Sequence, residues 1–182
     1  MINHKLLTSP LLIIFFCLCL GVTGCQNKPI INGIEGKIKR VVSAQTIEVI
    51  IENKSYQLRL TGLDIPSTQP QVKETQEAKQ FLINFFTLNN TIPLNTSIVM
   101  LETDLQVKDK FDRLSGYVWY NDQLVNQQLL REGYAIVNLK YTDGKYDRVL
   151  IDAQHYARIM EKGIWNVEWS IENREKQLIS NF

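Results

Sequence analysis

The stretch that decides the fold spans residues 43–66 and reads SAQTIEVIIENKSYQLRLTGLDIP. Its segments Thr46–Ile51 and Tyr56–Leu63 are rich in apolar and β-branched residues, which predicts two strands, and Asn53-Lys54 favours a turn between them. The two prolines within residues 65–70 leave little room for regular structure. We therefore expect a β-hairpin that runs into an irregular loop.

Outward from this hairpin, apolar periodicity predicts the remaining elements. They are strands at Ile34–Val42, Ile98–Glu102 and Leu114–Tyr120, and helices at Lys73–Leu88, Val125–Arg131 and Tyr146–Lys162. The apolar face predicted for the third helix consists of Val149, Leu150, Ala153, Ala157 and Met160. Three strands, a helix and two strands form the element order of an OB-type barrel, although a generic α+β domain has the same order.

The composition is that of an ordinary globular protein. The chain has 182 residues, of which 45% are hydrophobic and 21% charged, with 20 Lys and Arg against 19 Asp and Glu. The formal net charge of +1 argues against a broadly basic protein that coats nucleic acid. A local basic groove is compatible with a neutral total.

The N-terminus has the pattern of a secretory signal peptide. Met1-Ile2-Asn3-His4-Lys5 is followed by an apolar run from Leu11 to Leu20 and by small residues before Cys25. The apolar run is short for a membrane span, and a buried helix is the other interpretation. Val22-Thr23-Gly24-Cys25 resembles a bacterial lipobox, in which the signal is cut before a cysteine that carries a lipid.

Cleavage there predicts a lipid-anchored protein on the exported side of a bacterial cell envelope. Cys17 and Cys19 would be removed with the signal, so that Cys25 would be the only cysteine left and no intramolecular disulfide would form. The predicted layout is a signal peptide at 1–24, a lipidated tether at 25–33, an OB-fold domain at 34–169 and a polar tail at 170–182.

Several motifs, in register, resemble the staphylococcal nuclease-like (thermonuclease) family. They are Ser43-Ala44-Gln45-Thr46-Ile47-Glu48-Val49, Arg59-Leu60-Thr61-Gly62-Leu63-Asp64-Ile65-Pro66, Glu77-Ala78-Lys79-Gln80-Phe81-Leu82, Lys108-Asp109-Lys110-Phe111-Asp112-Arg113 and Gly163-Ile164-Trp165-Asn166. The resemblance covers residues 34–166 and implies a β-rich α+β fold, a five-stranded OB-fold barrel with three helices. It also implies cleavage of DNA and RNA phosphodiesters with calcium.

The resemblance assigns roles to particular positions. The two catalytic arginines fall on Arg59 and Arg113, whose guanidinium groups suit phosphoryl oxygens. The metal ligands fall on Asp64, Gln45 and the backbone carbonyl of Ile65, and the substrate-binding positions on Lys110, Phe111 and Tyr141. Outside the resemblance, the charged run 108–113 is typical of a solvated loop, and an aspartate such as Asp64 often satisfies turn amides.

Two positions depart from the family pattern. Gln45 stands where a calcium-binding aspartate is expected, and Ser67 stands where a glutamate serves as general base. Fewer charged ligands weaken calcium binding, and serine has no useful basicity near neutral pH. We therefore expect weak or lost calcium binding and catalysis unless Glu74 swings into the site, with single-stranded DNA or RNA still able to dock. The alternative is a non-catalytic module that binds a protein or envelope partner.

Overall fold

The computed structural model describes residues 31–66 and 73–166. The chain divides into two units, Met1–Ile30 and Ile31–Phe182, and every described residue belongs to the second. Among the described residues, no helix has both the length and the apolar character that a membrane crossing requires.

Several sequence-based expectations fall outside the described residues. These are the signal peptide, the lipidation of Cys25, the departure at Ser67 and the polar tail at 170–182. They therefore stay predictions, as does the domain layout built on them.

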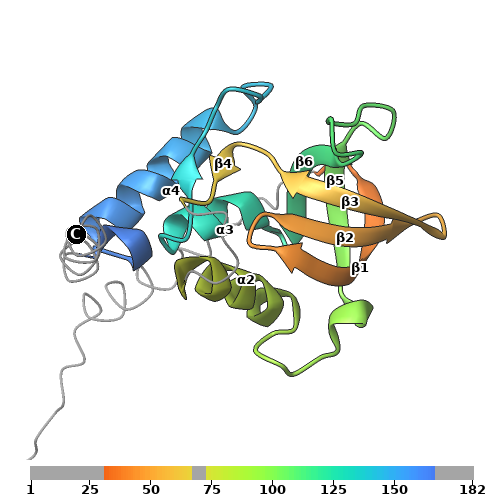
Figure 1. The fold of residues 1–182 in the computed structure, drawn as a ribbon, viewed down its shortest axis with the longest axis horizontal. Coiled ribbons are helices and arrows are strands. Elements are labelled where there is room, and N and C mark those ends of the chain that lie inside the picture. The colour runs from red at the N-terminus through yellow and green to blue at the C-terminus, as the bar shows by residue number, and fades with distance from the viewer. Residues whose placement is uncertain (1–30, 67–72, 167–182) are drawn as a thin grey trace, which may run out of the picture. The chain divides into compact units, whose positions relative to one another are not determined.

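A closed barrel forms the centre of the described fold. Its strands are β1 (Ile34–Ser43), β2 (Thr46–Ile51), β3 (Lys54–Leu60), β5 (Ile98–Thr103) and β6 (Leu114–Tyr120). They pair antiparallel in the order β3-β2-β1-β5-β6, and a parallel pairing of β3 with β6, in which Leu58 faces Leu114, closes the sheet on itself. This arrangement confirms the predicted five-stranded OB-fold barrel with its helices (Figure 1).

Apolar side chains from all five strands fill the barrel interior. β3 and β5 bury alternate positions, whereas β2 and β6 bury most of theirs, and each buried aliphatic side chain contributes about 1.5–3 kcal/mol relative to exposure. The register of β1 against β2 shifts between Ile38 and Arg40 and again between Val41 and Ser43. Such bulges bend a strand, which lets β1 pair with β2 at one end and with β5 at the other. Fully buried barrel residues include Ile38, Ile47, Leu58, Leu101, Leu114 and Val118.

The three helices lie together at one side of the barrel (Figure 1). They are α2 (Lys73–Phe86), α3 (Val125–Arg131) and α4 (Asp147–Ile159). The prediction for the buried face of α4 is wrong at two positions, because Val149 and Met160 are exposed while Leu150, Ala153 and Ala157 are buried. Val149 lies beside the buried stripe on the helix surface, and Met160 follows the last helical residue.

Short elements that periodicity did not predict shape the site. The predicted strand Tyr56–Leu63 ends at Leu60, turns at Gly62 and resumes as β4 (Leu63–Asp64), which pairs with β8 (Ile136–Val137). Gly62 has a φ of +82°, and a Cβ there would lie 2.3 Å from the Leu150 side chain. Glycine meets both constraints without strain, and the turn it allows redirects the chain toward Asp64. The other short elements are β7 (Gln123–Leu124) and the 3₁₀ turns η1 (Leu94–Thr96) and η2 (Gly163–Trp165).

A buried asparagine ties α3 to this turn. The side chain of Asn126 accepts a hydrogen bond from the Val118 N–H at 3.0 Å and donates to the carbonyls of Thr61 at 2.8 Å and Gly116 at 3.3 Å. Asn126 is completely buried, so each of these bonds satisfies a group that would otherwise be costly to desolvate. The network fixes the end of β3 relative to β6.

Candidate functional site

A cleft of about 790 Å³ opens at the end of the barrel where β3 and β4 meet two loops. The first loop leads from β5 into β6, and the second connects β8 to α4. Six predicted site residues line this cleft: Arg59, Asp64, Lys110, Phe111, Arg113 and Tyr141. Gln45 and Ile65 lie next to Asp64, bonded to each other. The fold therefore assembles residues that are far apart in the sequence.

Both oxygens of the Asp64 carboxylate have protein donors. Arg59 Nη2 donates to Oδ1 at 2.5 Å, and Asn138 Nδ2 donates to Oδ2 at 2.5 Å. Arg59 projects from β3, Asp64 lies on β4, and Asn138 follows β8, so the β4–β8 pairing brings the three together. Within the described part of the chain, the hydrogen bond from Nη2 to Asp64 is the one that Arg59 makes through its side chain.

Gln45 holds the chain next to Asp64. It is buried in the turn between β1 and β2, and its side-chain Oε1 accepts a hydrogen bond from the Ile65 N–H at 3.2 Å. Its backbone carbonyl accepts the Leu60 N–H at 2.9 Å. The three positions predicted as metal ligands, Gln45, Asp64 and Ile65, are therefore brought together, but Gln45 uses its side-chain oxygen inside the protein.

These residues do not fit a calcium ion. Calcium takes about 6–8 oxygen ligands, and carboxylates supply most of the charge. Here Asp64 is the one carboxylate at the position, both of its oxygens accept hydrogen bonds, and the Gln45 oxygen is occupied by Ile65. Across residues 31–66 and 73–166, no three His, Cys, Asp or Glu side chains come close enough to form a metal site.

Asp109 orients Arg113 in the segment between β5 and β6 that lines the cleft. Arg113 Nε and Nη2 both donate to Asp109 Oδ2, at 2.9 and 2.7 Å, while the backbone N–H groups of Phe111 and Arg113 donate to Oδ1. Partial burial raises the pKa of Asp109, but the hydrogen bonds from Arg113 and Phe111 outweigh it and hold the pKa below its usual value. Asp109 therefore stays ionised and keeps the guanidinium in place.

The rim of the cleft is aromatic and cationic. Phe111 is 64% exposed and Tyr141 is 78% exposed, which is unusual for large aromatic side chains without a ligand. The Phe111 ring lies 4.9 Å from the Arg113 guanidinium and 5.0 Å from Lys110 Nζ. Exposed rings beside cations offer a nucleobase a surface for stacking.

The charges that line the cleft balance. The basic side chains are Arg59, Lys108, Lys110 and Arg113, and the acidic ones are Asp64, Asp104, Asp109 and Asp143. Arg59 and Arg113 are each paired with one of these carboxylates. The cleft therefore has local cations at defined points rather than a continuous basic surface.

Two carboxylates near the motifs do not reach the cleft. Glu48 points to the outer face of β2, as its strand parity predicts, and its carboxylate binds Lys39 at 2.8 Å, Ser55 at 2.6 Å and Arg40. Hydrogen bonds from Lys39, Ser55 and Arg40 lower the pKa of Glu48 to about 2. Glu74 is not among the described residues that line the cleft.

Sequence reasoning missed Asn138. The residue directly follows an apolar pair, Ile136-Val137, and nothing in the local pattern distinguishes it from a solvated loop residue. Its contact with Asp64 depends on the pairing of Leu63 with Val137, which are far apart in the chain. A prediction of that pairing would have been needed to find it.

Residues 57–167 match the model of the family described as "Staphylococcal nuclease homologue". The chain belongs to this family. The matched segment contains Arg59, Asp64 and Arg113 and covers more than half of the chain. Membership of the staphylococcal nuclease homologue family makes the chain nuclease-like, with a function related to nucleic acid.

Relatives in this family carry nuclease names. The chain is 32% identical over 137 residues to a thermonuclease of Staphylococcus hyicus, a match that covers 71% of this chain and 75% of the relative. It is 30% identical to a thermonuclease of Staphylococcus intermedius, with 74% and 78% of the two chains covered. It is 29% identical to endonuclease YncB of Bacillus subtilis (strain 168), with 75% and 64% covered.

Proposed function

We propose that this protein is a lipid-anchored, nuclease-like protein of the bacterial cell envelope that binds DNA or RNA phosphodiesters with weak or lost calcium-dependent endonuclease activity. The observation that carries the proposal has two parts. Two arginines, each held by a carboxylate, line the cleft, and the side-chain oxygens at the predicted calcium position already accept hydrogen bonds from the protein. Arg59 and Arg113 line one cleft, while Gln45 and Asp64 are engaged in hydrogen bonds within the protein.

Phosphate binding follows from the geometry of the two arginines. Arg59 keeps Nε and Nη1 free among the described residues, and Arg113 keeps Nη1 free while Asp109 fixes the rest of the group. A guanidinium donates charge-assisted hydrogen bonds to phosphoryl oxygens, and a pre-oriented group loses little entropy on binding. Phe111 and Tyr141 would then stack against bases on either side of the phosphate.

Catalysis is expected to be weak because both groups that would activate water are changed. The position of the second calcium carboxylate holds the neutral Gln45, and the position of the general base holds Ser67. General base catalysis is typically worth about 10²–10⁴ in rate. The arginines can still stabilise charge on a phosphoryl group, so a residual rate is consistent with the proposal.

Anchoring rests on the N-terminal sequence. The signal pattern before Cys25 predicts cleavage and lipidation, and the first strand begins only at Ile34. The residues between them would serve as a tether to the membrane. One or more acyl chains on Cys25 would hold the barrel at the membrane without a spanning helix.

The balanced charge of the cleft favours a second candidate, a non-catalytic module that binds a protein or envelope partner. Four acidic side chains among the lining residues would repel a long polyanion. Such a module would not need the free guanidinium N–H groups. It would therefore tolerate the loss of Arg59 and Arg113.

The test uses a soluble form that begins at Gln26 and keeps every described residue. We would follow cleavage and binding of a labelled single-stranded oligonucleotide with calcium and with chelator. Arg59→Ala/Arg113→Ala is compared with Arg148→Ala/Arg158→Ala, which removes two arginines from α4 outside the cleft lining.

Binding that is lost only in the first double variant, with slow or absent cleavage, is the expected result. Fast cleavage that needs calcium would overturn the claim of weakened catalysis. Equal behaviour of the two double variants, with no binding by either the variants or the unchanged protein, would favour the partner-binding module.

A further inference from the structure

The loop between β8 and α4 supplies one wall of the cleft. Residues 138–146 carry Asn138, which binds Asp64, and also Tyr141 and Asp143, which line the cleft. A connection of this length needs contacts with the barrel if its side chains are to keep one position. Asn138 holds the N-terminal end, because its N–H also donates to the Gly62 carbonyl at 3.1 Å, and further contacts hold the C-terminal end.

Glu102 on β5 is the centre of those contacts. Its Oε1 accepts hydrogen bonds from the Tyr146 hydroxyl at 2.7 Å and the Trp119 Nε1–H at 3.0 Å. Its Oε2 accepts a hydrogen bond from Lys145 Nζ at 2.5 Å. The Glu102 side chain is only 10% exposed, so these charge-assisted bonds are weakly screened.

Ring packing extends this network to the cleft. Tyr146 packs edge-on against Tyr117, with centroids 4.7 Å apart, and against Trp119 at 5.7 Å. The Tyr117 hydroxyl donates to Asp143 Oδ1 at 3.2 Å, and the same oxygen accepts the Lys145 N–H at 3.0 Å. Burial and the neighbouring Asp143 raise the pKa of Tyr117, so its hydroxyl keeps the proton it donates.

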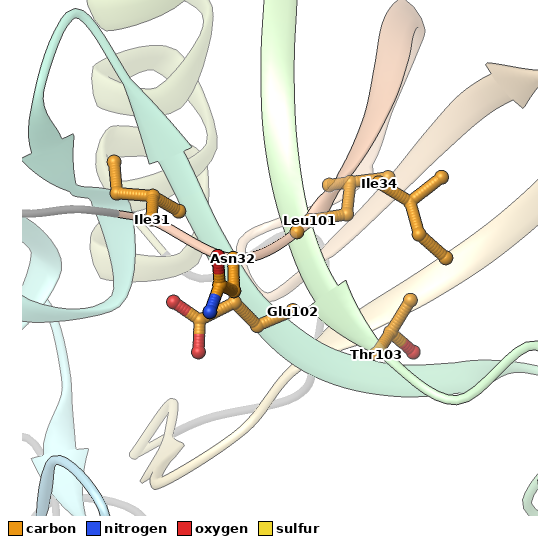
Figure 2. Close-up of a pocket in the computed structure, with 7 residues that line it drawn as sticks. Ile31, Asn32, Ile34, Leu101, Glu102 and Thr103 are labelled. Carbon is orange, nitrogen blue, oxygen red and sulfur yellow. The ribbon is translucent and has the colours of Figure 1, made fainter.

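Glu102 itself lies outside the cleft. It lines a separate pocket of about 430 Å³ together with Leu101, Thr103 and residues 31–34 (Figure 2). Figure 2 shows its carboxylate in the same pocket as the Asn32 side chain, at the point where the chain enters β1. Glu102 is not among the residues that line the cleft, and its contacts with the loop connect it to the cleft.

We propose that Glu102 is a positioning residue, which holds the C-terminal part of the loop 138–146 against the barrel so that Tyr141 faces a nucleic-acid ligand. Without this carboxylate, Lys145 and Tyr146 lose their shared acceptor, and the loop gains alternative positions. A ligand would then have to order the loop before binding, which lowers the affinity. The ligand in this inference is the one given under the proposed function.

The test compares Glu102→Leu and Glu102→Gln in the full chain, purified in mild detergent. Glu102→Leu removes every acceptor, whereas the amide oxygen of Glu102→Gln can still accept from Tyr146 and Trp119. Glu48→Gln is the matched control, because Glu48 is equally buried, at 11% exposed, and also binds three side chains, two on β1 and one on β3. Its partners do not line the cleft.

Two measurements separate positioning from general stability. Amide hydrogen exchange reports on the loop, and anisotropy of a labelled single-stranded oligonucleotide reports on affinity. We expect Glu102→Leu to expose amides within 138–146 selectively and to weaken binding roughly 10-fold, with partial rescue in Glu102→Gln. Glu48→Gln should leave both readouts unchanged even where it lowers the unfolding temperature.

Unchanged exchange in residues 138–146 of Glu102→Leu would overturn the proposal, and so would an equal change in the loop and in the barrel strands. Loss of loop protection without any change in affinity would also overturn it. If the unchanged protein does not bind the oligonucleotide, the proposed function fails at that point. The exchange measurement still decides whether Glu102 holds the loop.

Discussion

Asn138 donates a hydrogen bond from Nδ2 to the Oδ2 atom of Asp64, so that the carboxylate is held between an amide and the guanidinium of Arg59. A carboxylate that accepts bonds at both oxygens is satisfied without a metal ion. The same aspartate in a calcium site would need its oxygens free for the ion. The hydrogen bonds to Asp64, together with the neutral Gln45 beside it, are the reason that we expect calcium dependence to be weak or lost.

Restoring a carboxylate at position 45 should restore some calcium dependence. In Gln45→Asp the shorter side chain loses its bond to the Ile65 N–H and places a buried negative charge near Asp64. We expect the free energy of unfolding to fall by about 1–3 kcal/mol in chelator and to recover with calcium. Thermal unfolding with and without calcium measures this. Gln45→Asn controls for side-chain length, and an equal response of both variants to calcium would contradict the prediction.

The shape of the Arg113 side chain should matter beyond its charge. Arg113→Lys keeps the positive charge but removes the planar guanidinium. In the unchanged protein this group bonds Asp109 through Nε and Nη2 and can still donate a further N–H to a phosphate. We expect oligonucleotide affinity to fall by about 1–2 kcal/mol, measured by anisotropy at fixed salt. Lys110→Arg is the reciprocal control at an exposed position and should change affinity little. If Arg113→Lys binds like the unchanged protein, charge alone accounts for binding.

Oligonucleotide binding should depend only weakly on salt. Each phosphate neutralised by a single-stranded ligand contributes about −0.7 to the slope of log K against log salt concentration. With Arg59 and Arg113 as the principal contacts, and with acidic side chains among the cleft residues, we expect a slope between about −0.7 and −2. Titrations at several salt concentrations measure it. A slope steeper than about −4 would reveal a longer basic track than the described residues form.

Acid should destabilise the barrel through Glu48. The pKa of this carboxyl is lowered from 4.5 to about 2 by hydrogen bonds from Lys39, Ser55 and Arg40. A lowered folded-state pKa means that the stabilisation is complete above about pH 4.5 and is lost as pH falls toward 2. The free energy of unfolding, measured across this range, should change less with pH in Glu48→Gln than in the unchanged protein. An identical pH dependence in the two proteins would show that Glu48 does not contribute.

The buried Asn126 should be among the most sensitive positions for stability. Asn126→Ala leaves the Val118 N–H and the carbonyls of Thr61 and Gly116 without their side-chain partner. We expect a loss of about 2–4 kcal/mol in the free energy of unfolding, measured by denaturant titration. Gln127→Ala, one residue along the same helix and partly exposed, serves as the control and should cost about 0.5 kcal/mol or less.

Local sequence patterns determined most of the barrel. The strands Thr46–Ile51 and Leu114–Tyr120 were predicted at their observed bounds, and Val125–Arg131 was predicted at the observed bounds of α3. These segments bury one face or both, so the pattern of apolar residues follows directly from packing. The family motifs, which occur in the expected order and spacing, also identified the family. The family in turn implied a closed barrel, whereas periodicity alone was equally compatible with a generic α+β domain.

Only the tertiary structure decided the details of the site. The break at Gly62, the pairing of β4 with β8 and the position of Asn138 depend on contacts between residues far apart in the chain. The sequence identified Gln45 as a departure from the family, but only the fold shows that its oxygen is used to hold Ile65.

The anchoring of the loop by Glu102 has the same origin. Nothing in the residues around Glu102 indicates that its carboxylate meets Tyr146 and Lys145, because the pairing of β5 with β6 and the path of the loop bring them together. Composition and periodicity report which residues are buried. Hydrogen bonds between side chains on separate elements depend on how those elements pack, and packing is settled only when the whole chain is folded.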